Sequence, residues 1–109
     1  MTKKEKIKSY NKIRSEIKEK TFENKDKFFC KGCEQTVRSD FFTLDHVIKR
    51  SQSMFWYDKP ENLFPLCFNC NILRESKGDN YLKCAHEYVI IKDTLNYIYN
   101  RLTLEQRKE

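Results

Sequence analysis

Two groups of residues in this chain are of types that do chemistry, and the first is a carboxylate beside an imidazole. Asp45 and His46 lie inside an apolar, strand-like run whose other members are Phe41, Phe42, Leu44, Val47 and Ile48. Such a pair suits a metal site, an acid–base pair, or an ordinary hydrogen-bonded histidine at the end of a strand. A match of two residues does not distinguish these alternatives, so the rest of the chain must.

The second group is the cysteines, four of which form two Cys-x-x-Cys pairs: Cys30 with Cys33, and Cys67 with Cys70. Two intervening residues is the spacing that lets two thiolates reach one tetrahedral Zn²⁺. Disulfides are the competing explanation, but nothing marks the chain as secreted, and reducing compartments disfavour them. A redox pair would not need a second copy. The pattern therefore predicts one structural zinc ion.

The zinc ion would matter because the predicted core is small. Charged residues make up 35% of the chain and hydrophobic residues 39%. A structural zinc site is worth about 10–16 kcal/mol at neutral pH, whereas a whole domain is stable by about 5–15 kcal/mol. We therefore expect the metal to decide whether the chain folds.

The elements that position these residues follow from apolar spacing. Residues 3–20 are predicted to be an amphipathic helix because an apolar stripe recurs at helical period, formed by Ile7, Tyr10, Ile13 and Ile17. Residues 21–29 are predicted to be a connector. Gly32, in the tight turn that follows, is expected to have a positive φ.

The second half of the chain is predicted to contain an extended arm, a loop and two helices. The arm covers residues 35–48 and the loop residues 49–61, and a short extended piece then leads into a helix that ends at Gly78. Residues 81–107 are predicted to be one longer helix, with an apolar seam formed by Cys84, Tyr88, Ile91, Leu95, Ile98 and Leu102.

That seam is expected to pack against the stripe of the first helix, or to form a homodimer or bind a partner protein. Cys84 lies on the seam and is predicted to be a small buried residue without chemistry. His86 is predicted to be a surface residue.

The net charge of +6 is unevenly placed along the 109 residues. Residues 1–31 hold eleven basic and five acidic side chains and so carry the entire excess, whereas residues 32–109 are balanced. A localised basic segment predicts a polyanion such as DNA as partner, and a solvated lysine-rich helix is the alternative. No apolar run has the length of a membrane span and no hydrophobic signal region is present, so we expect a soluble intracellular protein with no membrane partner.

Taken together, the motifs resemble the HNH endonuclease family, in its zinc-stapled form. The matching residues are Cys30, Cys33, Asp45, His46, Asn62, Leu63, Leu66, Cys67, Cys70 and Asn71. The resemblance implies an α+β fold in a single domain, 1–109. A small ββα-metal finger at 30–78 would be stapled by a four-cysteine zinc site and flanked by a basic amphipathic helix at 1–22 and a helix at 81–107.

The resemblance also implies a reaction. His46 would be the general base that activates water, and Asn62 would fix the loop that orients it. Asp45 and Asn71 would hold one catalytic Mg²⁺ or another divalent ion. The substrate would be DNA, and the products would carry a 5′ phosphate and a 3′ hydroxyl.

Four basic residues near the motif are predicted to contact DNA: Lys49, Arg50, Arg74 and Lys77. Arg74 shares a helix face with Asn71, and an exposed helical arginine is the alternative for it.

The chain departs from the common family pattern in three places. Lys49 replaces a proline, Asn71 stands where histidine is usual, and "QSMFWYDKPE" fills a loop that usually has a Gly-Gly turn. The aromatic residues of that loop, 55–57, are expected to cap a small core, and stacking on bases is the alternative. A different class of function is a zinc-stapled nucleic-acid-binding module without catalysis.

Overall fold

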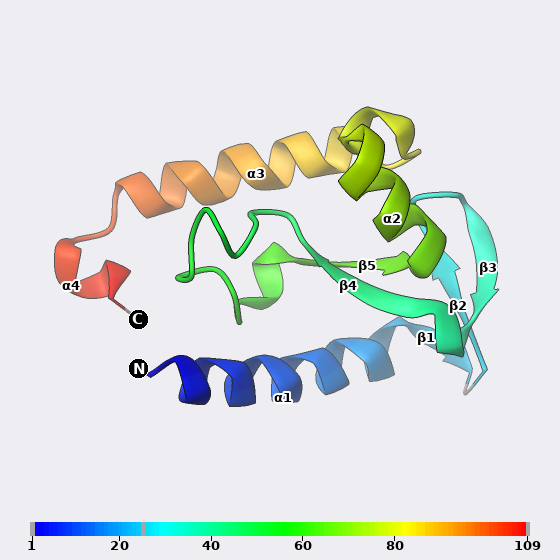
Figure 1. Ribbon diagram of the computed structural model, residues 1–109, viewed down its shortest axis with the longest axis horizontal. Coiled ribbons are helices and arrows are strands. Elements are labelled where there is room, and N and C mark those ends of the chain that lie inside the picture. The colour runs from blue at the N-terminus through cyan, green and yellow to red at the C-terminus, as the bar shows by residue number, and fades with distance from the viewer. Residues whose placement is uncertain (1, 25, 109) are drawn as a thin grey trace.

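The computed structural model describes residues 2–24 and 26–108, which form a mixed α+β domain with helices around two small sheets (Figure 1). The helices are α1 (Lys3–Thr21), α2 (Phe68–Lys77), α3 (Ala85–Asn100) and α4 (Leu104–Arg107). The strands are β1 (Phe22–Asn24), β2 (Lys27–Cys30), β3 (Gln35–Arg38), β4 (Phe42–His46) and β5 (Leu63–Cys67). Short 3₁₀ turns lie at η1 (Ser39–Phe41), η2 (Pro60–Asn62) and η3 (Asp79–Tyr81). The predicted fold class is confirmed.

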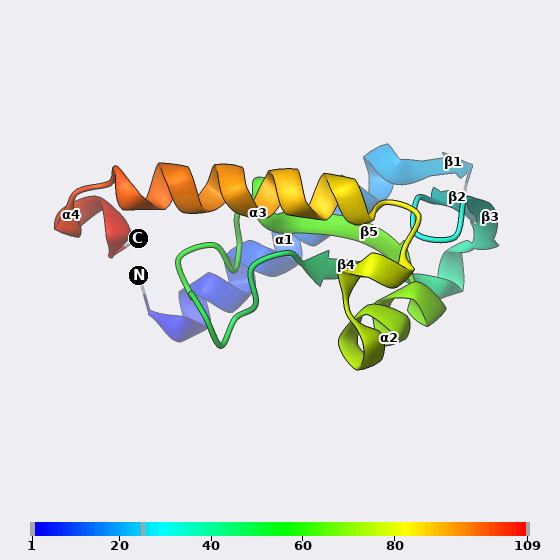
Figure 2. The same ribbon diagram turned by 90° about the horizontal axis from the view of Figure 1, so that it is seen from above.

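The hairpin of β4 and β5 is the centre of the molecule. The two strands are antiparallel, with Asp45 opposite Phe64 and His46 opposite Leu63. Helices α1 and α3 run along opposite sides of this hairpin, and α2 lies beside it near the three-stranded sheet β1–β2–β3 (Figure 1). The view from above shows α3 running along the length of the hairpin (Figure 2). Side chains alternate along a strand, so successive residues of β4 face α1 and the pair α2 and α3 in turn.

The core consists of two clusters of buried residues. The larger one joins the sheets to α2 and α3 and includes Phe28, Phe42, Leu66, Cys70 and Tyr88. The smaller one contains Ile48, Trp56 and Leu95, with Phe55 packed against it. Trp56 is only 5% exposed, which agrees with the expectation that the aromatic loop caps a small core.

The helix predicted over 81–107 is wrong at both ends. Helix α3 spans only 85–100, and a break separates it from α4, which Thr103 begins with a capping box. The seam is buried at Tyr88 and Leu95, but Ile98 is 42% exposed. The seam does not pack as predicted on the α1 stripe, because the hairpin lies between the two helices (Figure 1).

Two local predictions in the first half also need correction. The predicted connector 21–29 contains β1 and β2, which pair with each other and extend the sheet to β3. We call each Cys-x-x-Cys segment a knuckle. The residue with positive φ after the first knuckle, 30–33, is Glu34, at 56°, whereas Gly32 is not in the left-handed region. A Cβ on Gly32 would lie 2.9 Å from Sγ of Cys70, so close approach is what requires glycine there.

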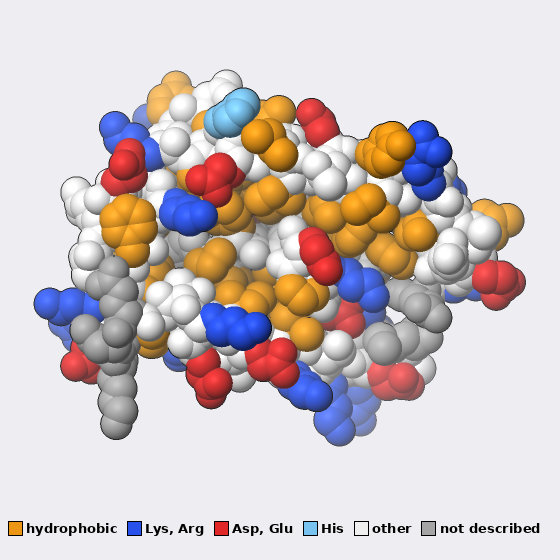
Figure 3. Space-filling view, turned by 180° about the vertical axis from the view of Figure 1, so that it is seen from behind, with side chains coloured by type: hydrophobic (Ala, Val, Ile, Leu, Met, Phe, Trp, Pro, Cys, Tyr) orange, Lys and Arg blue, Asp and Glu red, His pale blue; other side chains and the backbone are white. Residues whose placement is uncertain are grey.

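Figure 3 shows one face of the molecule, with many hydrophobic side chains across its middle. Charged side chains lie along the lower, α1 edge and also at the upper left and the right of this view. None of the helices in the described part of the chain is long and apolar enough to cross a membrane.

Candidate active site and metal centre

The four cysteines of the two pairs converge on one point. Cys30 ends β2, Cys33 follows in the turn, Cys67 ends β5 and Cys70 lies in the first turn of α2. Their sulfur atoms all lie within 4.8 Å of one another. All are free thiols rather than disulfides. The close approach of Gly32 to Cys70 is what lets the two knuckles meet.

This cluster fits a tetrahedral zinc ion. Zn–S bonds of about 2.3 Å place neighbouring sulfurs about 3.8 Å apart, which this cluster matches with little movement. The backbone N–H of Cys67 points at Sγ of Cys30, with 3.3 Å between the two atoms. Burial raises the pKa of Cys30, but N–H groups of Cys67, Cys33 and Gly32 outweigh it, so the pKa is lowered. A thiolate is the form that binds zinc.

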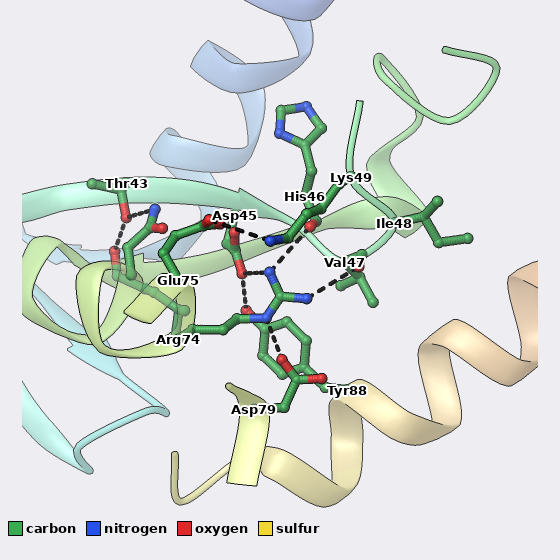
Figure 4. Close-up of polar contacts among 12 residues, drawn as sticks. Thr43, Asp45, His46, Val47, Ile48, Lys49, Arg74, Glu75, Asp79 and Tyr88 are labelled. Carbon is green, nitrogen blue, oxygen red and sulfur yellow. Dashed lines mark hydrogen bonds and ion pairs between the residues drawn. The ribbon is translucent and has the colours of Figure 1, made fainter. Parts of the chain in front are cut away.

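Asp45 lies on the face of β4 that looks toward α2 and α3 (Figure 4). Asp45 is only 4% exposed. Oδ2 pairs with Nη1 of Arg74 at 2.7 Å and accepts a hydrogen bond from the Tyr88 hydroxyl at 2.8 Å. Burial raises the pKa of Asp45, and Arg74 and Tyr88 oppose that shift without cancelling it. The charge of Asp45 is therefore already balanced inside the protein.

Arg74 is buried, at 5% exposure, which differs from both expectations for it. Its Nε lies 2.6 Å from Oδ1 of Asp79, and Nη2 donates to the carbonyl of Val47 at 3.1 Å. The guanidinium also lies over the ring of Tyr88, 4.6 Å from its centroid. In this conformation Arg74 joins α2, β4 and η3 (Figure 4) instead of facing solvent.

Asn71 lies one turn before Arg74 and makes a second link between α2 and β4. Its Nδ2 donates to Oγ1 of Thr43 at 3.1 Å. Among the described residues no hydrogen bond is donated to Oδ1 of Asn71 or to Oδ1 of Asp45. Those two oxygens are the hard donors that Mg²⁺ prefers, so the residues fit a divalent ion in kind. Arg74 weakens that fit, because its positive charge repels a second cation at Asp45.

His46 projects from the opposite face of the strand, toward α1 (Figure 4). Its Nε2 lies 3.0 Å from the carbonyl oxygen of Tyr57. A carbonyl only accepts hydrogen bonds, so Nε2 carries the proton and Nδ1 has the free lone pair. No described residue forms a hydrogen bond with Nδ1. Burial lowers the pKa of His46, which favours the neutral imidazole.

Asn62 fixes the loop that supplies this carbonyl. It is fully buried, and its Oδ1 accepts a hydrogen bond from the backbone N–H of Ile48 at 2.6 Å. Its Nδ2 donates to the carbonyls of Ile48, at 3.0 Å, and Trp56, at 3.1 Å. Asn62 thus ties together the two ends of the loop next to Tyr57. The predicted role of Asn62 in orienting His46 stays a prediction.

The remaining predicted site residues are exposed cations. Lys49 pairs with Glu75 at 3.3 Å. The guanidinium of Arg50 lies 5.6 Å from the Tyr57 ring centroid, and Nζ of Lys77 lies 5.6 Å from that of Tyr81. His86 and Cys84 are respectively exposed and buried, as predicted.

Sequence reasoning missed the residues that surround the predicted pair. The Tyr57 carbonyl is a backbone group, and no side-chain pattern indicates it. Tyr88 was assigned only to the seam, although its hydroxyl reaches Asp45. Asp79, which holds Arg74, lies in a turn with no motif of its own.

Comparison with known proteins agrees with these motifs. Residues 30–77 match the family model of HNH endonuclease. No curated protein and no solved structure matched the chain.

Proposed function

We propose that this protein hydrolyses phosphodiester bonds of DNA with His46 as general base, because residues 30–77 match the family model of HNH endonuclease. The observation that carries the proposal is the contact between Nε2 of His46 and the Tyr57 carbonyl. It leaves a basic nitrogen on a neutral imidazole, which is what proton abstraction from water requires. The products are a 5′ phosphate and a 3′ hydroxyl.

In this mechanism Nδ1 of His46 accepts the proton of the attacking water. The Tyr57 carbonyl holds the ring in its tautomer, and it stabilises the imidazolium that forms when Nδ1 is protonated. Asn62 acts through the loop, keeping that carbonyl in place. The lowered pKa of His46 keeps the base unprotonated at neutral pH.

Two metals have separate roles in the proposal. Zinc at Cys30, Cys33, Cys67 and Cys70 holds the fold. Asp45 and Asn71 are the residues that would hold Mg²⁺ or another divalent ion. When bound, that ion would supply charge stabilisation at the phosphate and the leaving oxygen. Asp45 and His46 lie on opposite faces of β4, so the end of this strand must bend for the ion and the base to meet one phosphate. Arg74 makes this second site weak and reversible.

The exposed cations account for DNA binding in the same proposal. Lys49, Arg50 and Lys77 lie in or beside the segments that carry the site, and four exposed lysines in the first half of α1 add to them, namely Lys3, Lys4, Lys8 and Lys12. Lysine and arginine contacts to phosphates make binding strongly dependent on salt. Arg74 can contribute only if it leaves Asp45.

The test is cleavage of supercoiled plasmid with and without Mg²⁺. His46→Ala should lower the rate by about 10²–10⁴-fold, the usual contribution of a general base, while zinc content and DNA affinity stay unchanged. His86→Ala is the matched control, because His86 is an exposed histidine outside the motif. Wild-type cleavage by His46→Ala would remove this residue from the mechanism.

A second candidate function is a zinc-stapled DNA-binding module without catalysis. The observation that favours it is the ion pair that occupies Asp45. A wild-type protein that contains one zinc, binds DNA and cuts nothing with Mg²⁺, Mn²⁺ or other divalent ions would establish this alternative.

A further inference from the structure

Helix α1 lies outside the residues that match the family, yet it packs on the loop beside the proposed base. Lys6, in its second turn, is only 6% exposed, which is rare for lysine. Its Nζ lies 2.8 Å from Oδ1 of Asp58 and donates to the carbonyl of Phe55 at 3.1 Å. One buried ammonium thus holds the loop on both sides of Tyr57.

The ion pair of Lys6 and Asp58 is built into the interior. Side-chain exposures are 7% for Lys6 and 5% for Asp58, so both charges have left water. Burying a charged side chain costs desolvation free energy. Charges are therefore buried only where each one has a partner that offsets this cost. Lys6 therefore has a defined position, and so does the loop segment 55–58 that it contacts.

Tyr10, one helical turn after Lys6, contacts the proposed base itself. Its ring centroid lies 5.3 Å from that of His46 and 4.9 Å from that of Tyr57. The rings of His46 and Tyr57 are nearly parallel, at 6°, with centroids 4.9 Å apart. The three rings form one cluster, in which α1 limits how far the imidazole can rotate.

We propose that α1 is a working part of the active site, with Lys6 and Tyr10 as positioning residues for His46. Lys6 holds the Tyr57 carbonyl at Nε2, and Tyr10 packs against the imidazole so that Nδ1 stays available to water. This inference rests on the proposed function of His46. It divides α1 into a face that supports the base and a face of exposed lysines that meets DNA.

The loop is consequently fixed from two sides by two different elements. Asn62 binds the carbonyl of Trp56, and Lys6 binds the carbonyl of Phe55. Tyr57 is the next residue, so its carbonyl direction depends on both anchors. The family motif supplies only the first anchor, and the second comes from a helix that precedes the motif.

The test compares Lys6→Met and Tyr10→Leu with wild type in two measurements. The first is the single-turnover cleavage rate at saturating DNA, together with the Kd for the same DNA. A displaced base should lower the rate by about 10²-fold and leave Kd unchanged. Lys83→Met and Tyr97→Leu are matched controls, because both residues are exposed, Tyr97 lies in α3 and Lys83 just before it, whereas His46 faces α1. They should leave rate and Kd at wild-type values.

The second measurement is ¹⁵N NMR of the histidine rings. The chain has only two histidines, and His86 is exposed, so His86 is an internal reference. Wild type should show His46 protonated at Nε2 alone. Lys6→Met should shift His46 toward a mixture of tautomers, whereas His86 should not change. If Lys6 only stabilised the fold, Lys6→Met would lower the helical content. A change in the His46 tautomer at wild-type helical content therefore indicates positioning.

A third variant separates positioning from folding. Tyr10→Phe keeps the ring that contacts His46, so it should retain the wild-type rate that Tyr10→Leu loses. A wild-type rate and an unchanged His46 spectrum in Lys6→Met and Tyr10→Leu would overturn the proposal. If wild type itself cuts nothing, the proposed function fails, and the NMR comparison still decides whether α1 positions the ring.

Discussion

The two faces of strand β4 differ sharply at neighbouring residues. On one face the Asp45 carboxylate is buried and neutralised by Arg74 and Tyr88. On the other, His46 is held by one nitrogen, and no described residue forms a hydrogen bond with the other nitrogen. The first face is closed by contacts within the protein, and the second presents a reactive group. In the proposed function, the base His46 is therefore held in position before substrate binds, whereas an ion at Asp45 would have to compete with Arg74.

The difference arises from what packs on each face. Helix α2 brings a guanidinium to Asp45, and α3 brings a phenol, so both the charge and the hydrogen-bond capacity of Oδ2 are used. Helix α1 brings to His46 only an aromatic ring and, through Lys6, a fixed loop. The charge of Arg74 neutralises Asp45, whereas the ring of Tyr10 only limits the motion of His46. Four predictions test this comparison, beginning with the change that should unfold the hairpin and so disrupt both faces of β4.

Removing zinc should have the largest effect, because the knuckles hold the hairpin that carries both faces. Cys67→Ser, or chelation of wild-type protein, should lower stability by most of about 10–16 kcal/mol and unfold much of the domain. Circular dichroism and zinc content measure this. Cys84→Ala is the control, since Cys84 is buried but outside the sulfur cluster, and it should keep its zinc. A folded, zinc-free Cys67→Ser protein would contradict the assignment.

Arg74→Met should come next and should act only on the Asp45 face. It leaves Asp45 and Asp79 without their guanidinium, and breaking a buried pair costs about 3–5 kcal/mol. Mg²⁺ should then raise the Tm of the variant more than that of wild type, because among the described residues Arg74 is the only one that forms an ion pair with Asp45. The exposed pair Arg38–Asp40 provides the control: Arg38→Met should cost about 0–1 kcal/mol.

Equal Mg²⁺-induced shifts in Tm for wild type and Arg74→Met would show that the ion does not bind at Asp45. Titration calorimetry with Mg²⁺ would give the same answer independently of unfolding, since the variant should bind the ion more tightly.

Tyr88→Phe should have a smaller effect on the same face. It removes the hydroxyl that donates to Asp45, and hydrogen bonds to charged groups are worth about 1.5–3 kcal/mol. Urea denaturation measures the loss. Tyr81→Phe removes the hydroxyl of a 63% exposed tyrosine and should leave stability unchanged. A Tyr88→Phe protein as stable as wild type would mean that this hydrogen bond adds nothing to closing the face.

The smallest expected effect is a pH dependence on the His46 face. Burial raises the pKa of Asp58, but Lys6 and Ser9 outweigh it, so the pKa lies below the ordinary 3.8. The unfolded chain therefore holds this proton at higher pH than the folded chain does. Stability from Asp58 is present above pH 3.8 and is lost as the pH falls through the folded value.

Asp58→Asn should accordingly be less stable than wild type near neutral pH, and the difference should shrink on acidification. Urea denaturation at a series of pH values measures it, and the difference between the two proteins removes the contribution of acid-driven zinc loss. A difference that grows toward low pH would give the opposite sign and would contradict the ion pair.

Much of the fold was predictable because local patterns sufficed. The stripe of residues 7–17 indicated α1, the Cys-x-x-Cys pairs indicated the metal cluster, and Gly78 marked the end of α2. The long C-terminal helix was overextended, since the seam continues past Asn100 while Thr103 begins a new helix. Periodicity reports which residues could share a face, and a capping residue overrides it locally.

In the candidate site, too, some features were predictable from the sequence and others were set by the tertiary structure. The spacing of the cysteines by itself indicated a four-cysteine metal cluster, because two Cys-x-x-Cys pairs are visible along the chain. The resemblance to the HNH family implied that the Asp-His pair and two asparagines belong to the same motif. Only the tertiary structure decided that Arg74 lies on Asp45, that a backbone carbonyl holds His46, and that Lys6 and Tyr10 of a distant helix reach the same loop. Those contacts join residues 11 to 49 positions apart. Packing of α1, α2 and α3 around one hairpin sets them, and no local pattern encodes that packing.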